Sequence, residues 1–218
     1  MLQYAIFDLD GTLLDSMPMW QELPAAFCRR KGKQPLPGLA DEISRRTLPE
    51  AVEYLKSTYG LADSPAAIQQ ELGRIALDAY RTTVASKPGV PAALEGLHRA
   101  GIKMCVASAS EEDQIQAALE RLDLAKYFEF ILSCTQAGAG KEHPDVYLQS
   151  LARLGGSDPA QAVVFEDVLH AASTAKAAGF RVAGVADDFS ASSWPALQQL
   201  CDWWFTDASQ WLRVLEQP

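Results

Sequence analysis

The chain has 218 residues, of which 48% are hydrophobic and 22% charged, and its formal net charge is −9 at pH 7. These proportions exclude a disordered or fibrous chain and fit a globular protein with one large domain, or with a core and a modest insertion. The acidic excess argues against a general affinity for nucleic acid or anionic lipid, so neither a nucleic acid nor a membrane is expected as a partner.

The amino-terminal segment and the cysteines bear on location. No apolar stretch approaches the ~18 residues of a membrane span, and the short apolar run before Asp8 lacks the basic region of a signal peptide. The cysteines lack metal-binding spacing and are expected to be reduced; they are Cys28, Cys105, Cys134 and Cys201. We expect a cytoplasmic protein.

Short apolar runs predict strands, and helical spacing between them predicts helices. In chain order the strands are expected at residues 4–7, 103–107, 130–132, 162–165, 181–185 and 203–205, and the helices at residues 90–99, 111–122, 145–154 and 169–178. This alternation predicts an α/β fold with a doubly wound parallel sheet, Rossmann-like, covered on both faces. The run Trp203–Trp204–Phe205 is expected to be a buried terminal strand that belongs to the core.

The interval between the first strand and residue 86 breaks the alternation. It contains helical stretches at residues 20–30, 49–59 and 66–83 and no convincing strand from Met17 to Ser86. Proline and glycine in "SKPGVP" then mark the return to the core. We therefore expect a helical domain over residues 17–85, inserted into a core domain formed by residues 1–16 and 86–218.

Polar residues follow the predicted strands, and in a doubly wound sheet they converge beyond the carboxyl ends of the strands. This set comprises Asp8, Asp10, Thr12, Ser108, Lys141, Glu166 and Asp167. Clustered carboxylates need a cation among them, and oxygen ligands without histidine or cysteine suit Mg²⁺ that a substrate phosphate completes.

The first motif also suggests the reaction. A carboxylate can attack phosphorus if a metal and a lysine neutralise the phosphoryl oxygens. Asp10, two residues after Asp8, is placed to protonate the leaving oxygen and later to deprotonate the attacking water. Gly11 lets the backbone turn sharply and approach the phosphate.

Four motifs in order, "DLDGT", "VASAS", "GKEHPDVY" and "VVFEDV…AAG", resemble those of the haloacid dehalogenase superfamily. The resemblance implies a magnesium-dependent phosphatase that hydrolyses small phosphomonoesters, such as sugar phosphates, through an aspartyl phosphate. It implies Asp8 and Asp10 as catalytic residues, Thr12, Ser108, Ala109 and Lys141 as phosphate ligands, and Asp8, Asp10, Glu166 and Asp167 as metal ligands. The helical insertion resembles the superfamily's α-helical cap.

Some residues depart from this pattern, and they keep alternatives open. Relatives often have serine and glycine where this chain has Val168 and Ala171, so a hydroxyl that supports a metal ligand is expected to be missing. A non-catalytic relative that binds a phosphorylated metabolite is one alternative. Another is a phospho-accepting signalling module, which receiver domains resemble, although a receiver needs no helical insertion.

A further alternative is a mutase, because the resembled capped relatives include β-phosphoglucomutases. Those mutases carry a cap-side histidine shortly after the first motif, and the matching residue here is Trp20. An indole offers a single N–H donor and accepts no proton, so it cannot replace that histidine. Hydrolysis is therefore favoured over phosphoryl transfer to a sugar.

Overall fold

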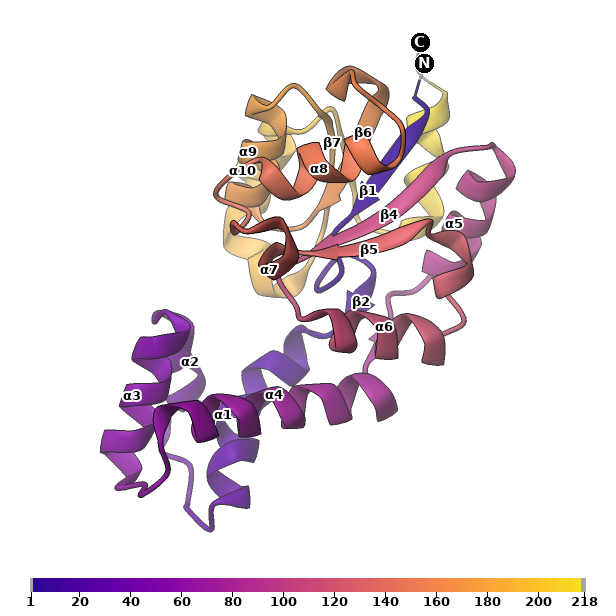
Figure 1. Cartoon of the computed structure of the whole chain (residues 1–218). Coiled ribbons are helices and arrows are strands. Elements are labelled where there is room, and N and C mark those ends of the chain that lie inside the picture. Colours follow the sequence, from indigo (N-terminus) through magenta and orange to yellow (C-terminus); the bar gives the residue numbers. More distant parts are fainter. Residues whose placement is uncertain (1, 217–218) are drawn as a thin grey trace. The chain divides into compact units, whose positions relative to one another are not determined.

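The structure is a computed structural model that describes residues 2–216, and it divides the chain into two compact units (Figure 1). The larger unit is Met1–Asp15 with Ala85–Pro218, and the smaller unit is Ser16–Val84. This division falls one residue earlier at each junction than the domains expected from the sequence. Residues 1, 217 and 218 of the expected core domain lie outside the described residues.

The larger unit is built on a six-stranded parallel sheet in the order β5-β4-β1-β6-β7-β8. Its strands are β1 (Tyr4–Phe7), β4 (Lys103–Ser108), β5 (Phe130–Ser133), β6 (Ala162–Glu166), β7 (Arg181–Val185) and β8 (Trp203–Phe205). The chain runs outward from β1 through β4 to β5, and then returns to the other side of β1 at β6. The expected doubly wound fold is confirmed, and β1 is its topological switch point, where ligands bind in such sheets.

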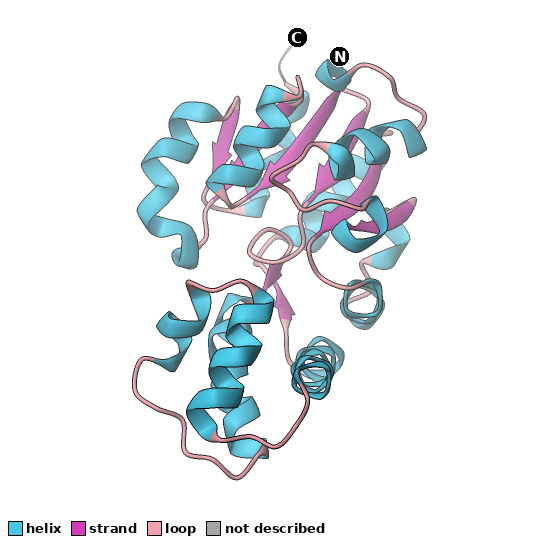
Figure 2. Ribbon diagram, turned by 60° about the vertical axis from the view of Figure 1, so that its left-hand side comes forward, coloured by secondary structure: helices cyan, strands magenta, loops and turns pink. Residues whose placement is uncertain are grey.

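Helices cover both faces of this sheet (Figure 2). The α-helices are α5 (Val90–Arg99), α6 (Glu112–Arg121), α7 (Cys134–Ala137), α8 (Asp145–Arg153), α9 (Leu169–Ala177) and α10 (Trp194–Leu200). Short 3-10 helices follow at Ala125–Tyr127, Pro159–Gln161, Asp188–Ser193 and Ala208–Leu215. None of the helices within residues 2–216 is long and apolar enough to cross a membrane.

Alternation along β1 supplies both faces of the core, because successive side chains of a strand point to opposite sides. Tyr4 and Ile6 join an apolar cluster that includes residues of α8, α9 and α10. Phe7 stacks on Phe165 with ring centroids 4.4 Å apart, and Trp211 packs 4.9 Å from Phe165. The ends of β1 and β6 are thereby fixed on both sides.

The same alternation corrects one expectation about β8. Trp203 and Phe205 are buried, as expected, but Trp204 is 49% exposed. A strand at the edge of a sheet keeps its period of two, so the middle residue of a three-residue run turns away from the buried face. Trp204 instead lies edge-on to Trp194, with ring centroids 6.4 Å apart.

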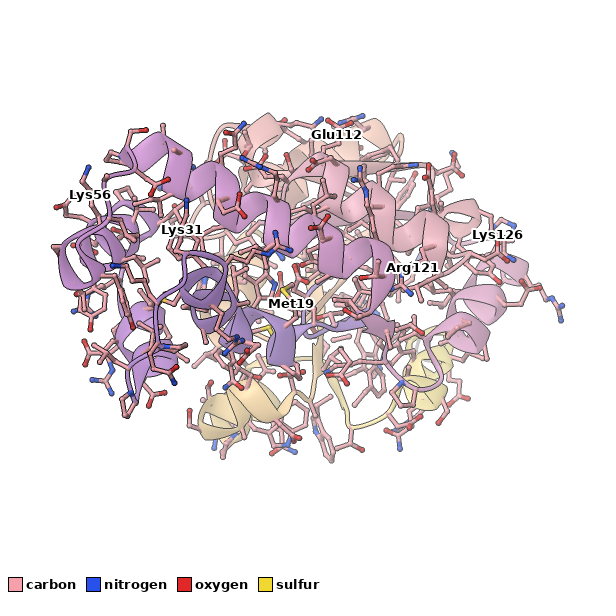
Figure 3. All side chains as sticks on the ribbon, turned by 90° about the horizontal axis from the view of Figure 1, so that it is seen from below. Met19, Lys31, Lys56, Glu112, Arg121 and Lys126 are labelled. Carbon is pink, nitrogen blue, oxygen red and sulfur yellow. The ribbon has the colours of Figure 1, made fainter. Side chains whose placement is uncertain are left out.

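The smaller unit is helical, with α1 (Met17–Arg30), α2 (Leu39–Ser44), α3 (Leu48–Tyr59) and α4 (Pro65–Thr82). Thr47 and Glu50 form a capping box at the start of α3, and Ser64 accepts a hydrogen bond from the Ala67 N–H at the start of α4. Lys31 and Lys56, both labelled in Figure 3, bond to Asp63 through its carboxylate and its carbonyl oxygen respectively.

A short antiparallel ladder lies at the two junctions between the units. It pairs β2 (Leu14–Asp15) with β3 (Ala85–Ser86), so the chain leaves the larger unit and returns to it at adjacent points. The expectation of no strand up to Ser86 is therefore wrong at residues 85 and 86. Two paired residues are too few to produce a periodic pattern in the sequence.

Candidate active site

The loop after β1 brings the first motif to the carboxyl edge of the sheet. The Asp8 N–H donates to the Phe165 carbonyl oxygen at 3.0 Å, which continues the pairing of β1 with β6. Gly11 has φ +81°, and a Cβ atom on this residue would lie 2.4 Å from Oδ2 of Asp167. Only glycine permits this turn so close to the second acidic motif.

Three buried carboxylates meet at this edge. Asp8, Glu166 and Asp167 each offer an oxygen, and these oxygens lie within 4.8 Å of one another. Burial, which is the larger cause, and repulsion from Glu166, which is the smaller, together raise the pKa of Asp167 to about 7. Burial also raises the pKa of Asp8 well above its ordinary value, although Lys141 opposes the shift. The cluster therefore resists full ionisation without a compensating cation.

Lys141 is the cation that the chain itself supplies. Its Nζ donates to Asp8 Oδ1 and, at 2.6 Å, to Glu166 Oε1. Burial alone would lower the pKa of this lysine, but attraction to Asp8 and Glu166 outweighs it, and the pKa is raised above its ordinary value. Lys141 is thus charged, buried and shared by two acidic motifs that are far apart in the sequence.

The residues present fit a divalent metal ion. Oε2 of Glu166 is buried and has no hydrogen-bond partner among residues 2–216, although Oε1 of the same group accepts two bonds. A buried acceptor without a donor is costly unless a cation or water meets it. All the atoms that this cluster could offer to a metal ion are carboxylate oxygens, which suits Mg²⁺. Of the four expected metal ligands, Asp10 does not belong to this group.

Asp10 lies instead beside the loop after β4. The Ser110 hydroxyl donates to Asp10 Oδ2 at 2.6 Å. Ser108, the last residue of β4, is 1% exposed, and its hydroxyl accepts a bond from the Ser110 N–H at 3.1 Å, while Ala109 between them is exposed. The second motif therefore lies beside the first at the same edge.

Thr12 supplies a hydroxyl to Asp167, one of the expected metal ligands. The Thr12 hydroxyl donates to Oδ1 of Asp167 at 3.1 Å, and the side chain of Thr12 is fully buried. Val168 offers no such group, yet Asp167 has a hydroxyl donor from the first motif. Residue 168 thus lacks a hydroxyl, and the expected phosphate ligand Thr12 donates its own hydroxyl to Asp167.

Sequence reasoning missed two residues of this arrangement. Tyr147 on α8 donates from its hydroxyl to Glu166 Oε1 at 2.8 Å, and Ser110 bonds to Asp10 as described above. Ser110 could have been found, because it ends the "VASAS" motif at the mouth of β4. A tyrosine among apolar residues of a helix indicates core packing by default, so nothing in the sequence marked Tyr147.

Within the helical unit, Trp20 takes part in a local contact. Its indole N–H donates to the Tyr80 hydroxyl at 3.2 Å, and the two rings lie edge to face with centroids 6.5 Å apart. This contact joins α1 to α4. The indole donor thus already has a partner inside the unit to which it belongs.

The larger unit therefore places Asp8, Asp10, the shared Lys141 and the acidic pair Glu166–Asp167 at the switch point of a parallel sheet. Lys141 can neutralise an anion, and the carboxylates of Asp8, Glu166 and Asp167 can hold a cation. Such an edge can bind a phosphate together with a divalent metal ion.

Comparisons with known proteins agree with this geometry. The family model for haloacid dehalogenase-like hydrolases matches residues 5–185. The phosphorylated carbohydrates phosphatase of Thermotoga maritima is 32% identical over 189 residues, which cover 84% of this chain and 85% of that protein. Hexitol phosphatase B of Escherichia coli K12 is 29% identical over 188 residues, covering 81% and 80%.

A solved structure agrees over the full length. A Thermotoga maritima protein provisionally assigned as a β-phosphoglucomutase aligns with a TM-score of 0.83 and 27% identity over 99% of both chains. The names of the curated relatives confirm the expected class of enzyme, a phosphoric monoester hydrolase. The chain belongs to the haloacid dehalogenase-like hydrolase family.

Proposed function

We propose that this enzyme is a magnesium-dependent phosphatase that hydrolyses small phosphomonoesters, such as sugar phosphates, through an aspartyl phosphate on Asp8. One observation carries the proposal: the buried Lys141 ammonium bridges Asp8 and Glu166, beside a Glu166 oxygen that no donor within residues 2–216 meets. A carboxylate can approach an anionic phosphoryl group only where positive charge neutralises the negative oxygens, and Lys141 supplies one such charge while the unpartnered oxygen offers a place for a metal cation that would supply another.

The reaction then has two displacements. A carboxylate oxygen of Asp8 attacks phosphorus, and the bond from phosphorus to the ester oxygen breaks while Asp10 gives that oxygen a proton. Water next attacks the same phosphorus, Asp10 takes its proton, and the bond between phosphorus and Asp8 breaks to release phosphate. The bond from Ser110 supports this role, because it fixes the Asp10 carboxylate.

The remaining residues would hold the ligands. Asp8, Asp167 and Glu166 would hold Mg²⁺, which when bound neutralises phosphoryl oxygens and the acidic cluster. Ser108, the Ala109 backbone and Lys141 would bind the phosphate. We assign the role of a cap to the helical insertion, expected at residues 17–85, and a sugar phosphate substrate is supported by relatives named for phosphorylated carbohydrates and hexitols.

The substitution Asp8→Asn tests the nucleophile. It should lower the rate of phosphate release at least ~1,000-fold, because an amide is a poor nucleophile toward phosphorus. Phosphate release from a panel of sugar phosphates, with and without Mg²⁺, is the measurement. The matched control is Asp15→Asn at an exposed position, which should keep its activity. Substantial activity in Asp8→Asn would contradict the covalent mechanism.

Phosphorus NMR separates a phosphatase from a mutase. With β-glucose 1-phosphate and a bisphosphate primer, we expect free phosphate to accumulate faster than the 6-phosphate. Two facts support this outcome. Residue 20 is a tryptophan, which cannot accept a proton as a histidine can. Its single N–H already donates to the Tyr80 hydroxyl. If the sugar 6-phosphate formed much faster than free phosphate, the chain would be a mutase.

A further inference from the structure

Tyr147 stands out as a buried hydroxyl in an apolar environment. The residue is 1% exposed, it lies in the apolar cluster between the sheet and α8, and its ring packs edge-on to Phe180 at a centroid distance of 6.2 Å. A phenylalanine would fill the same space. The hydroxyl therefore requires its own explanation, because burying it without a partner would be unfavourable.

That partner is Glu166, which ends β6. The Tyr147 hydroxyl donates to Oε1 of Glu166 at 2.8 Å, and Lys141 donates to the same oxygen at 2.6 Å. Burial and the nearby Glu166 charge raise the pKa of Tyr147, so the hydroxyl keeps its proton and acts as a donor. Both donors meet one oxygen, and Oε2 has no hydrogen-bond partner among the described residues.

Two donors on one oxygen fix the plane of a carboxylate and the direction of its other oxygen. If Lys141 were the only donor, the Glu166 carboxylate could rotate about the bond that joins it to Cγ and still keep its ion pair with Lys141. The second bond, from a rigid ring held by α8, removes that freedom. Groups that orient a metal-binding carboxylate from behind commonly change metal affinity when they are removed.

We propose that Tyr147 is a positioning residue that aligns Glu166 for the divalent metal ion and keeps Oε2 free for it. This inference rests on the proposed function, because it assumes that the acidic cluster binds Mg²⁺. Tyr147 does not contact the substrate in this proposal. It acts through Glu166 alone, and its removal should therefore weaken metal binding while the phosphate contacts of Ser108 and Lys141 remain.

The test compares Tyr147→Phe with the wild-type enzyme by calorimetric titration with MgCl₂. We expect Mg²⁺ to bind about tenfold more weakly to the variant. The concentration of Mg²⁺ that gives half the maximal rate should rise equally, whereas KM for the phosphomonoester at saturating Mg²⁺ should stay the same. The matched control is Tyr4→Phe, which removes a hydroxyl from the same apolar cluster at the opposite end of β1.

A double-mutant cycle shows whether the effect passes through Glu166. In the background of Glu166→Gln, the further change Tyr147→Phe should leave Mg²⁺ affinity unaltered. Wild-type affinity in Tyr147→Phe, or an equal weakening in both backgrounds, would overturn the positioning role and leave the proposed function intact. A wild-type enzyme that neither binds Mg²⁺ nor needs it for turnover would overturn the proposed function itself, before any variant is compared.

Discussion

The ion pairs of Lys141 in the larger unit and one ion pair of the helical unit differ sharply in burial. In the larger unit, the ion pairs of Lys141 are buried: the side chains of Lys141, Asp8 and Glu166 are 8%, 9% and 1% exposed. In the helical unit, Arg29 and Glu22 form a pair whose side chains are 54% and 59% exposed. The same chemistry therefore stands in two very different dielectric environments.

This difference separates function from local stability. Exposed pairs on helices contribute little, because water and salt screen them. Buried pairs are sensitive to the loss of one partner, since the other charge is then left uncompensated. The larger unit thus concentrates its electrostatic cost at one edge of the sheet, where a ligand can relieve it.

Removal of Lys141 should produce the largest effect on stability. Lys141→Ala leaves three buried carboxylates without their cation, and we expect a loss of about 3–5 kcal/mol in the free energy of unfolding near neutral pH. Urea denaturation of the metal-free protein measures it. The control Arg29→Ala, in the exposed pair, should change stability little. Equal losses in both variants would remove the contrast between the units.

A pair of glycine substitutions tests how closely the first motif must approach Asp167. Gly11 and Gly138 have nearly the same backbone angle, φ +81° and +83°, but only Gly11 has atoms close to the position of a Cβ. Both alanine variants should lose about 1–2 kcal/mol of stability from strain. Gly11→Ala should in addition lose most phosphatase activity and Mg²⁺ binding, whereas Gly138→Ala should keep both.

The acidic cluster should make stabilisation by Mg²⁺ depend on pH. The pKa of Asp167 is raised to about 7, so its proton favours the folded state in acid, and this stabilisation is lost as the pH rises through that value. Mg²⁺ competes with the proton. The rise in Tm on adding Mg²⁺ should therefore be larger at about pH 8 than at about pH 5.5, as followed by thermal melting.

The rise in Tm with Mg²⁺ can also be compared between the wild type and a variant of Lys141. In Lys141→Met the acidic cluster loses its own cation, so the rise in Tm with Mg²⁺ at the higher pH should exceed that of the wild type. A rise that is equal at both pH values would argue against metal binding by the ionised cluster.

The smallest effect is expected in the helical unit. Thr47→Ala removes one half of the capping box of α3 and should lower stability by about 1 kcal/mol. Phosphate release should be unchanged, because the Thr47 hydroxyl at the N-terminus of α3 is uncharged and does not belong to the acidic cluster. Thr47→Ser serves as the control, since serine restores the hydroxyl. A large loss of activity in Thr47→Ala would show that function extends to this helix.

The sheet, and the meeting of Asp8 with Glu166 at one of its edges, were predictable because the strands follow simple periodicities. The apolar runs of β1 and β6 end directly before Asp8 and Glu166, and parallel strands bring their carboxyl ends to one edge. The connection of Lys141 to both carboxylates depends on a loop between α7 and α8. The contact of this loop residue with both carboxylates could be inferred only from the motif that surrounds it.

Other features had no local signal. The bond from Thr12 to Asp167 joins residues that are far apart in the sequence, and it replaces a hydroxyl that was sought at Val168. Tyr147 resembles any core aromatic residue until its hydroxyl is seen beside Glu166. Exposure of Trp204 follows from the place of β8 at the edge of the sheet, which a three-residue run does not reveal.

The two-residue ladder of β2 and β3 has a consequence for how the chain tolerates change. Because Leu14 pairs with Ser86 and Asp15 with Ala85, the insertion is in effect one long loop whose ends are already closed. The entropy of closing a loop grows slowly, by about 0.6 kcal/mol for each doubling of its length. Helices can therefore be lengthened, shortened or exchanged between these two pairs at little cost to the parallel sheet.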